Sequence, residues 1–445
     1  MRIAKPDPAA QGPLTVEGLA AQVASRLHLV PARFRRVIRY TPLGLAGPTL
    51  VDDAHFDLSR HVRALPGEGP VSEAGLVELI DAYAAEPLDR NRPLWEIAVT
   101  PELDDGRRAI LLKMAHALVE GEGGVANAAL LVFDASPDPE PAPPPQPWRP
   151  TPAPDRAEEI RLAIRDQISR LTSLTRGPPS VARIAASARR LWDAFGTYRS
   201  EIVGRRPQAR YSPPMGPRHA TAFAVCPTAQ VEAIRAAAGN GVTFNDVLLT
   251  AAAGGFRRWQ AAVGLEAGDL TAAVPVNLSR KDGEVPPVLT EMPSFMLVRL
   301  PVTDPSPDGR LRLVRIATAR GKEVAPKLAM VSAAFAQLPS ALYRRLADHL
   351  YDSTQDFYLA NIQGPDMELY VLGHKVEFAY ITGRTRRPLR AAALSFAGSM
   401  TVGIACDPDR VPEPGVLARC IEEEVDALAA SAASATPGPA QRSSS

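Results

Sequence analysis

The sequence predicts a two-part α/β protein, and three observations support this prediction. Segments with the periodicity of strands alternate with segments typical of helices before residue 134, and the same mixture returns after residue 218. A proline-rich run separates the two parts, and two amphipathic segments follow it as a helical connector. With 445 residues and no internal repeat, the chain is long enough for two domains that each bury a core.

The first part, residues 1–135, has helix and strand signals in turn. Residues 16–27 (VEGLAAQVASRL) and 76–86 (LVELIDAYAAE) predict helices. Residues 94–99 (LWEIAV) and 107–117 (RRAILLKMAHA) predict strands. These elements together predict one α/β domain.

Proline and amphipathic patterns define the middle of the chain. Residues 134–155 (DASPDPEPAPPPQPWRPTPAPD) contain too many prolines for a helix or a sheet, so we expect a semi-rigid extended linker over residues 136–155. The connector, residues 156–210, shows two helical repeats. The first repeat is Ile160, Ile164, Ile168 and Leu171, and the second is Val181, Ile184, Ala188, Leu191 and Phe195.

The second domain is expected over residues 211–430. Its strand signals lie at residues 219–225, 270–276, 294–300 and 369–378, and its helix signals lie at residues 231–238 and 245–259. The uncharged run AAALSFAGSMTVGIAC predicts two strands joined by a turn near Gly398. Residues 431–445 are small and polar and predict a disordered tail.

Bulk composition excludes several classes of protein. A net charge of +1 gives no basic excess, which argues against nucleic-acid binding. The three cysteines are far apart and form no CxxC, which argues against a disulfide framework and indicates a reducing compartment. The N-terminus has no apolar signal region, and the longest uncharged run is too short to span a bilayer. We therefore expect a cytoplasmic protein that touches membranes only peripherally.

One histidine ends an apolar strand signal in ILLKMAHALVEGEGG. A period of two places Ile110, Leu112, Met114 and His116 on one face, beside a glycine-rich turn. At this point two interpretations are open. His116 is either a core histidine that has found a hydrogen bond or a base delivered to a cavity.

Other chemistry is not expected at this histidine. His116 and Glu120 are four residues apart, a spacing that pairs metal ligands only on a helix, and the glycines that follow argue against a helix. No third ligand lies nearby, so we expect no metal. The chain has no GxSxG elbow, Walker loop or dinucleotide fingerprint. A working His116 would therefore act as a general base on a bound hydroxyl or amine.

Seven motifs in a fixed order resemble one family. They are FDLSRHVRALP, PLDRNRPLWEIAV, AHALVEG, FNDVLLTAAAGGFRRW, VPVNLSR, NIQGP and LSFAGSMTVGIACDP. Over most of residues 15–428 the chain is similar to the bacterial wax ester synthase/diacylglycerol acyltransferases, CoA-dependent acyltransferases related to peptide-synthetase condensation domains. The resemblance implies two chloramphenicol acetyltransferase-like domains with mixed sheets flanked by helices.

The family signature is His-His-x-x-x-Asp-Gly, and this chain departs from it at two positions. Ala115, His116, Glu120 and Gly121 occupy the four fixed places. The resemblance implies that His116 is the catalytic base and that the carboxylate of Glu120 holds the loop. It also implies a short segment and a strand before the helix near residue 16, of which only MRIAK remains.

The remaining motifs admit structural roles. Thr243 can cap a helix with Asp246 at its third position, so we expect Asn245 and Asp246 to cap the helix and support the site indirectly. The resemblance places Asn361 near the site, although NIQGP also fits a simple turn after a strand. Trp95 is expected in the core or in the wall of a substrate channel.

The resemblance implies acyl transfer from acyl-CoA to diacylglycerol or a fatty alcohol, with acyl-CoA as a substrate and no cofactor. The family places its base where a channel passes between two α/β halves. Two alternatives stay open. One is a degenerate member that binds acyl-CoA or lipid without turnover, and the other is a condensation-type enzyme that acylates an amine or another alcohol.

Two basic segments fit lipid or CoA partners. The connector helices carry arginines and the aromatic residues Trp192, Phe195 and Tyr198, so they can lie on the inner membrane or on a lipid droplet. They can equally pack on the body of the protein. The basic run GRTRRPLR, residues 383–390, can meet CoA phosphates or anionic headgroups, or can be solvated.

Overall fold

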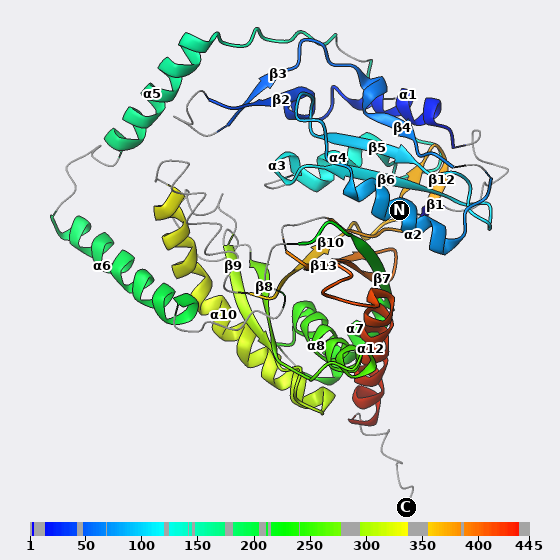
Figure 1. The fold of residues 1–445 in the computed structure, drawn as a ribbon, viewed down its shortest axis with the longest axis vertical. Helices are drawn as coiled ribbons and strands as arrows, with labels where there is room; N and C mark the ends of the chain where they lie inside the picture. Colours follow the sequence, from blue (N-terminus) through cyan, green and yellow to red (C-terminus); the bar gives the residue numbers. More distant parts are fainter. Residues whose placement is uncertain are drawn as a thin grey trace, which may run out of the picture. The chain divides into compact units, whose positions relative to one another are not determined.

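The chain forms two compact units. The computed structural model describes residues 2–3, 14–41, 48–67, 69–119, 124–140, 142–144, 147–173, 181–203, 211, 215–239, 241–276, 294–336, 355–383 and 387–435 (Figure 1). The first unit comprises Met1–Ser187, Ala334–Leu346 and Asp366–Ala379, and the second comprises Ala188–Ala333, Ala347–Pro365 and Tyr380–Ser445. The predicted two-part α/β organisation is confirmed.

A mixed sheet of six strands organises the first unit. Its order is β11–β12–β1–β6–β5–β4, in which β4 and β5 are parallel. The strands are β1 (Arg2–Ile3), β4 (Val62–Ala64), β5 (Trp95–Val99), β6 (Arg108–Met114), β11 (Tyr370–Val371) and β12 (His374–Phe378). A separate hairpin joins β2 (Arg36–Arg39) to β3 (Thr49–Asp52).

The hairpin of β11 and β12 corrects one sequence-based assignment. Residues 369–378 were expected as a single strand of the second domain, but Leu372 and Gly373 take positive φ and turn the chain back on itself. β12 then pairs with β1, where Arg2 faces Phe378, so the hairpin belongs to the first unit. The short segment MRIAK supplies β1, which lies between β12 and β6.

Helices and short turns complete the first unit. They are α1 (Val16–Arg26), α2 (Glu73–Ala85), α3 (His116–Val119), α4 (Gly124–Val132) and α5 (Arg156–Ser173), with 3-10 turns at Ala32–Arg35 and Leu58–Arg60. The described residues of the linker, 136–140, 142–144 and 147–155, contain neither helix nor strand. The predicted apolar stripe of α5 is not buried, because Ile164 and Ile168 are 48% and 55% exposed.

A second mixed sheet of six strands organises the second unit. Its order is β7–β14–β13–β10–β8–β9, and β10 runs parallel to both β13 and β8. The strands are β7 (Ala220–Pro227), β8 (Leu270–Val276), β9 (Ser294–Leu300), β10 (Phe357–Gln363), β13 (Leu389–Phe396) and β14 (Ser399–Cys406). The turn predicted near Gly398 is confirmed, since Ala397 and Gly398 both have positive φ, as a two-residue hairpin loop requires.

Three helices pack on one face of this sheet: α7 (Thr228–Ala237), α8 (Phe244–Ala262) and α12 (Pro414–Ala435). The unit also contains α10 (Pro307–Ala336), most of α6 (Val181–Tyr198), which begins in the first unit, and a π-helical turn at Arg199–Val203. α12 lies against α7, α8 and β7 (Figure 1). Because α12 continues to Ala435, residues 431–435 are helical and the predicted tail boundary was wrong. Residues 436–445 lie outside the described part.

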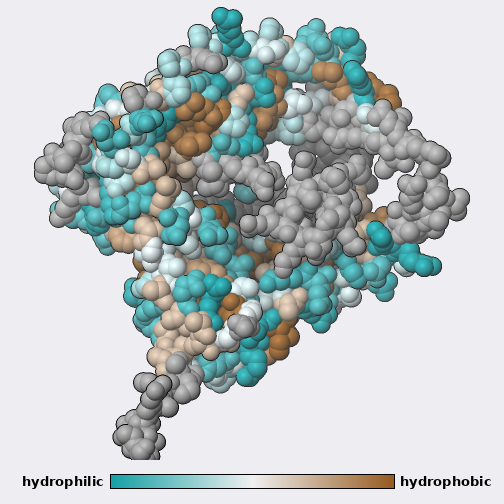
Figure 2. Space-filling model, turned by 180° about the vertical axis from the view of Figure 1, so that it is seen from behind, coloured by the Kyte–Doolittle hydropathy of each residue, from teal (hydrophilic) through white to brown (hydrophobic). Residues whose placement is uncertain are grey.

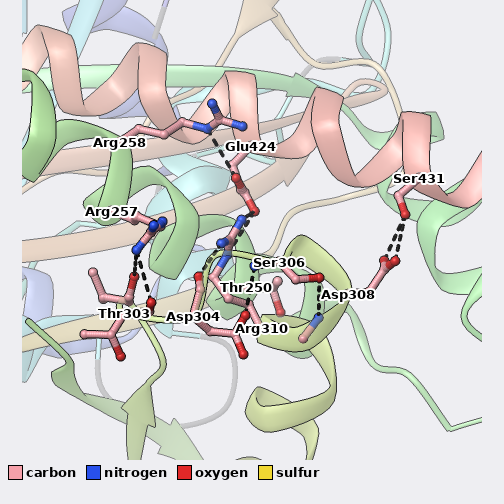
Figure 3. Close-up of polar contacts among 12 residues, drawn as sticks. Thr250, Arg257, Arg258, Thr303, Asp304, Ser306, Asp308, Arg310, Glu424 and Ser431 are labelled. Atoms are coloured by element: carbon pink, nitrogen blue, oxygen red, sulfur yellow. Dashed lines mark hydrogen bonds and ion pairs between the residues drawn. The ribbon is translucent and has the colours of Figure 1, made fainter. Parts of the chain in front are cut away.

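Two glycines allow α8 and α12 to approach closely. A Cβ at Gly254 would lie 2.0 Å from Cδ of Glu424, and a Cβ at Gly255 would lie 2.5 Å from Cγ1 of Ile421. Glu424 is completely buried and pairs with Arg310 of α10, while Nε of Arg258 lies 3.3 Å from its second oxygen (Figure 3). The ion pairs therefore connect three helices, and the buried carboxylate is compensated by charge.

The connector helix α6 packs against α10. Ala194 is fully buried, Lys327 Nζ lies 2.9 Å from Asp193, and Arg320 lies 2.6 Å from Glu201. In this half of the connector the prediction of packing on the body is therefore correct. No helix in the described part of the chain is long and apolar enough to cross a bilayer.

Candidate active site

Strand β6 leads to the candidate base, and its alternation follows the prediction as far as Met114. Leu111 and Lys113 face α2, where Lys113 Nζ donates to the carbonyl oxygen of Tyr83 at 2.9 Å. Burial lowers the pKa of Lys113. Ile110, on the other face, is fully buried, and Met114 pairs with Trp95 of β5.

The strand ends before His116, which corrects the predicted register. The amide of Ala115 still donates to the carbonyl oxygen of Leu94 at 2.9 Å, but His116 begins the short helix α3. Leu118 anchors this helix, being only 3% exposed, whereas the His116 side chain is exposed. The expectation that the following glycines prevent a helix here was wrong. Glu120 and Gly121 lie outside the described residues.

One core histidine of this unit is His61, which the motif FDLSRHVRALP contains but which sequence analysis did not single out. Its ring stacks on Trp95 at 4.5 Å and on Phe56 at 5.1 Å, and its Nδ1 lies 2.7 Å from the carbonyl oxygen of Trp95. Burial is the main cause of its lowered pKa. Trp95 is itself 1% exposed and donates from Nε1 to the carbonyl oxygen of Phe34 at 2.8 Å.

In the second unit, two predicted site residues meet. Nδ2 of Asn361, near the end of β10, donates to Oδ1 of Asn245, at the start of α8, over 2.7 Å. Oδ1 of Asn361 is buried and has no partner. Because buried polar atoms are normally hydrogen-bonded, this oxygen is an acceptor available to a bound molecule.

The predicted capping box at the start of α8 is confirmed. The Asp246 amide lies 3.2 Å from Oγ1 of Thr243, and the Asp246 carboxylate accepts from the Thr243 amide at 2.8 Å. Its other oxygen accepts from Thr318 of α10 at 2.7 Å, a partner that no sequence pattern indicated. Asp246 is 2% exposed and therefore fixes the helix start that carries Asn245.

The basic run at residues 383–390 is only partly a loop. Arg387 is 3% exposed and donates to the carbonyl oxygen of Gln355, and Arg390 lies in β13. Arg387 is therefore not solvated, Arg390 is half-buried, and residues 384–386 lie outside the described part. Within the described chain, no three His, Cys, Asp or Glu side chains are grouped to hold a metal ion.

Family models match both parts of the chain. The wax ester synthase/diacylglycerol acyltransferase catalytic domain matches residues 1–248, and the C-terminal domain of the same family matches residues 292–429. The chain belongs to the wax ester synthase/diacylglycerol acyltransferase family. Membership confirms the resemblance seen in the motifs and makes this protein an acyltransferase.

Curated relatives of the family cover nearly the whole chain. A probable diacylglycerol O-acyltransferase of Mycobacterium tuberculosis is 30% identical over 444 residues, which span 93% of this chain and 88% of the relative. A putative diacylglycerol O-acyltransferase of the same species is 29% identical over 436 residues, with 93% and 89% covered.

Solved structures share the fold. The wax ester synthase/diacylglycerol acyltransferase of Marinobacter aquaeolei matches with a TM-score of 0.65 at 21% identity, covering 97% of this chain and 93% of that one. The starter condensation domain of rhizomide synthetase matches with a TM-score of 0.53 at 14% identity, covering 96% and 88%. The predicted fold class, with two mixed sheets flanked by helices, is confirmed.

Proposed function

We propose that this protein transfers a long-chain acyl group from acyl-CoA to diacylglycerol or a fatty alcohol, with His116 as general base. The observation that carries the proposal is the different environment of two histidines, His61 and His116. His61 is buried against Trp95, whereas His116 begins α3 with an exposed side chain directly after the strand. The exposed imidazole of His116 is open to a substrate, whereas the His61 ring is engaged by its stack on Trp95 and by the Trp95 carbonyl oxygen.

The chemistry needs one base that takes and returns a proton. His116 accepts the proton of the acceptor hydroxyl while the hydroxyl oxygen attacks the thioester carbonyl carbon. The carbon–sulfur bond then breaks, and the same proton passes to the CoA sulfur, so that an ester and free CoA leave. Because no acyl-enzyme forms, both substrates must be bound at once, and their alignment supplies much of the rate.

The backbone around His116 supports this role. The Ala115 amide is held by Leu94, and Leu118 anchors α3 from below. Ala115, at the first signature position, is thus fixed through its main chain, which does not depend on the side chain that stands there. The base therefore keeps its position although the signature differs at Ala115.

We also propose that the exposed connector surface contacts lipid. Trp192 is 82% exposed, and Arg189 and Arg190 on the same helix are exposed. Indole and aliphatic side chains enter the headgroup boundary while arginines meet anionic lipids. On the face drawn in Figure 2, hydrophilic residues predominate and hydrophobic residues form separate patches.

The test measures CoA release from palmitoyl-CoA by the purified protein, with and without dioleoylglycerol or hexadecanol. Wild type is compared with His116→Gln and with His55→Gln, a second exposed histidine of the same unit. Release that depends on an acceptor, disappears in folded His116→Gln and persists in His55→Gln supports the proposal. A loss on the order of 10²-fold or more is expected for a general base.

Two other outcomes would replace the proposal. Palmitoyl-CoA binding without release, whichever acceptor is added, indicates a family member that binds acyl-CoA without turnover. Release only with hexadecylamine indicates a condensation-type enzyme. Equal release by wild type and His116→Gln would remove His116 from the mechanism.

A further inference from the structure

The sheet of the second unit has a second face that its helices do not cover. Alternate residues of β13, such as Leu389 and Ala391, enter the core beneath α8 and α12, so Arg390 points to the opposite face. The pairing between neighbouring strands places five side chains in one row across this face. The row is Thr221 of β7, Ala405 of β14, Arg390 of β13, Tyr358 of β10 and Ala273 of β8.

The segment Tyr380–Gly383 lies over this face. The Tyr380 ring contacts Phe223 with centroids 4.5 Å apart, and the Ile381 carbonyl oxygen lies 2.0 Å from where a Cβ of Gly403 would be. Nη1 of Arg390 lies 3.1 Å from where a Cβ of Gly383 would be. The guanidinium is therefore enclosed between the sheet and Gly383.

Arg390 has no counter-charge among the described residues. Two other arginines of low exposure are paired with carboxylates, Arg310 with Glu424 and Arg107 with Asp105 and Glu377. Near Arg390 no described carboxylate comes within ion-pair distance, and its flanking neighbour in β14 is Ala405. Burial lowers the pKa of Arg390, with Tyr358 acting weakly in the opposite direction. An enclosed guanidinium without an anion is costly, and a bound anion removes that cost.

Two buried hydroxyl groups, one in this row and one in the segment that lies over it, are also unsatisfied. Oγ1 of Thr221, in the same row, and Oγ1 of Thr382, adjacent to Gly383, are buried and have no hydrogen-bond partner. Buried hydroxyls without partners indicate a missing donor or acceptor. A guanidinium with neighbouring hydroxyl donors is the set of groups that binds oxyanions.

We propose that Arg390, with the Thr382 hydroxyl of the segment that lies over it, binds an oxyanion of a substrate, either a phosphate of CoA or the carboxylate of a fatty acid or acidic acceptor. This inference rests on the proposed acyltransferase function. The planar guanidinium holds either group through two parallel N–H donors.

Calorimetric titration of the full-length protein tests the site with three probes: CoA, 3′-dephospho-CoA and palmitate. The variants are Arg390→Met, Arg390→Lys and the control Arg299→Met. Arg299 lies on β9 of the same sheet, but it is exposed and paired with Asp269 at 3.1 Å. Arg390→Met is expected to weaken one ligand at least about tenfold, as loss of a charged hydrogen bond predicts, and Arg299→Met is expected to leave it unchanged.

The probes identify the source of the anion. If Arg390→Met binds CoA more weakly than wild type does, while both proteins bind 3′-dephospho-CoA equally, the anion is the 3′-phosphate. If the variant binds both CoA and 3′-dephospho-CoA more weakly, the anion is the pyrophosphate. If only the affinity for palmitate falls, the anion is a carboxylate. Equal affinities for all three probes in wild type and Arg390→Met, or no binding of any probe to wild type, would overturn the inference.

Unfolding without ligand separates this role from a structural one. Removal of an arginine that stabilises the fold lowers the urea midpoint. Removal of an uncompensated cation leaves the urea midpoint unchanged or raises it. Arg390→Met is therefore expected to unfold at the same or a higher urea concentration than wild type. If the proposed acyltransferase function is wrong, the result is different: wild type binds CoA but transfers no acyl group.

Discussion

His61 stacks on Trp95 with ring centroids 4.5 Å apart, and its Nδ1 lies 2.7 Å from the Trp95 carbonyl oxygen. Since Trp95 pairs with Met114, this stack lies beneath the end of the strand that leads to His116.

This burial predicts a pH-dependent stability. Burial lowers the folded-state pKa of His61 below its ordinary value near 6.5, so the unfolded chain binds the proton more readily. Stability from this residue is present above about pH 6.5 and is lost as pH falls toward the folded pKa, with a slope of at most about 1.4 kcal/mol per pH unit. Urea unfolding at several pH values, compared with His61→Gln, measures this component.

The matched control for this effect is His55→Gln, which removes an exposed histidine. That variant is expected to keep the pH dependence of wild type. A His61→Gln protein with the same pH dependence as wild type would show that His61 is not held neutral in the folded state.

The amide pair of Asn245 and Asn361 is expected to couple α8 to β10. The 2.7 Å hydrogen bond joins residues 116 positions apart, so truncating either side chain to alanine removes the same bond. A double-mutant cycle by urea unfolding is expected to give a coupling of about 1 kcal/mol. Strictly additive effects of Asn245→Ala and Asn361→Ala would mean that the bond contributes nothing to stability.

Glu424→Gln is expected to destabilise the second unit strongly. The change leaves Arg310, which is 2% exposed, without its charge partner, and the cost of breaking such a pair is about 3–5 kcal/mol. Chemical unfolding followed by circular dichroism measures it. Glu423→Gln, on the exposed side of α12, is the control and should change stability by less than about 0.5 kcal/mol. Similar values for the two variants would contradict a role for the buried pair.

Trp192→Ser is expected to weaken association with lipid while leaving the fold intact. The side chain is 82% exposed, so its loss removes little packing, but it removes an indole that can enter the headgroup region. Flotation with phosphatidylcholine vesicles, with and without phosphatidylglycerol, measures the effect. Met367→Ser, at a residue 50% exposed in the first unit, is the control, and equal flotation of both variants would place the lipid contact elsewhere.

Local sequence was sufficient for most elements of the fold. The capping box of Thr243 and Asp246, the Gly398 hairpin and the helices at residues 16–27 and 245–259 follow from contacts within a few residues, so they appear where they were expected. The order of the motifs was enough to identify the family. Position 116 was recognised as the candidate base from the same motifs.

Long-range contacts decided the rest. The β11–β12 hairpin joins the first unit because β12 pairs with β1 across more than 370 residues, and no local pattern encodes that pairing. The roles of the two histidines depend on which one Trp95 covers. The pairing of Glu424 with Arg258 and Arg310 depends on residues from two other helices. Sequence by itself determined the elements, the family and the candidate base, because these depend on local periodicity and motif order. Only the tertiary structure decided burial and pairing, because both depend on residues brought together by folding.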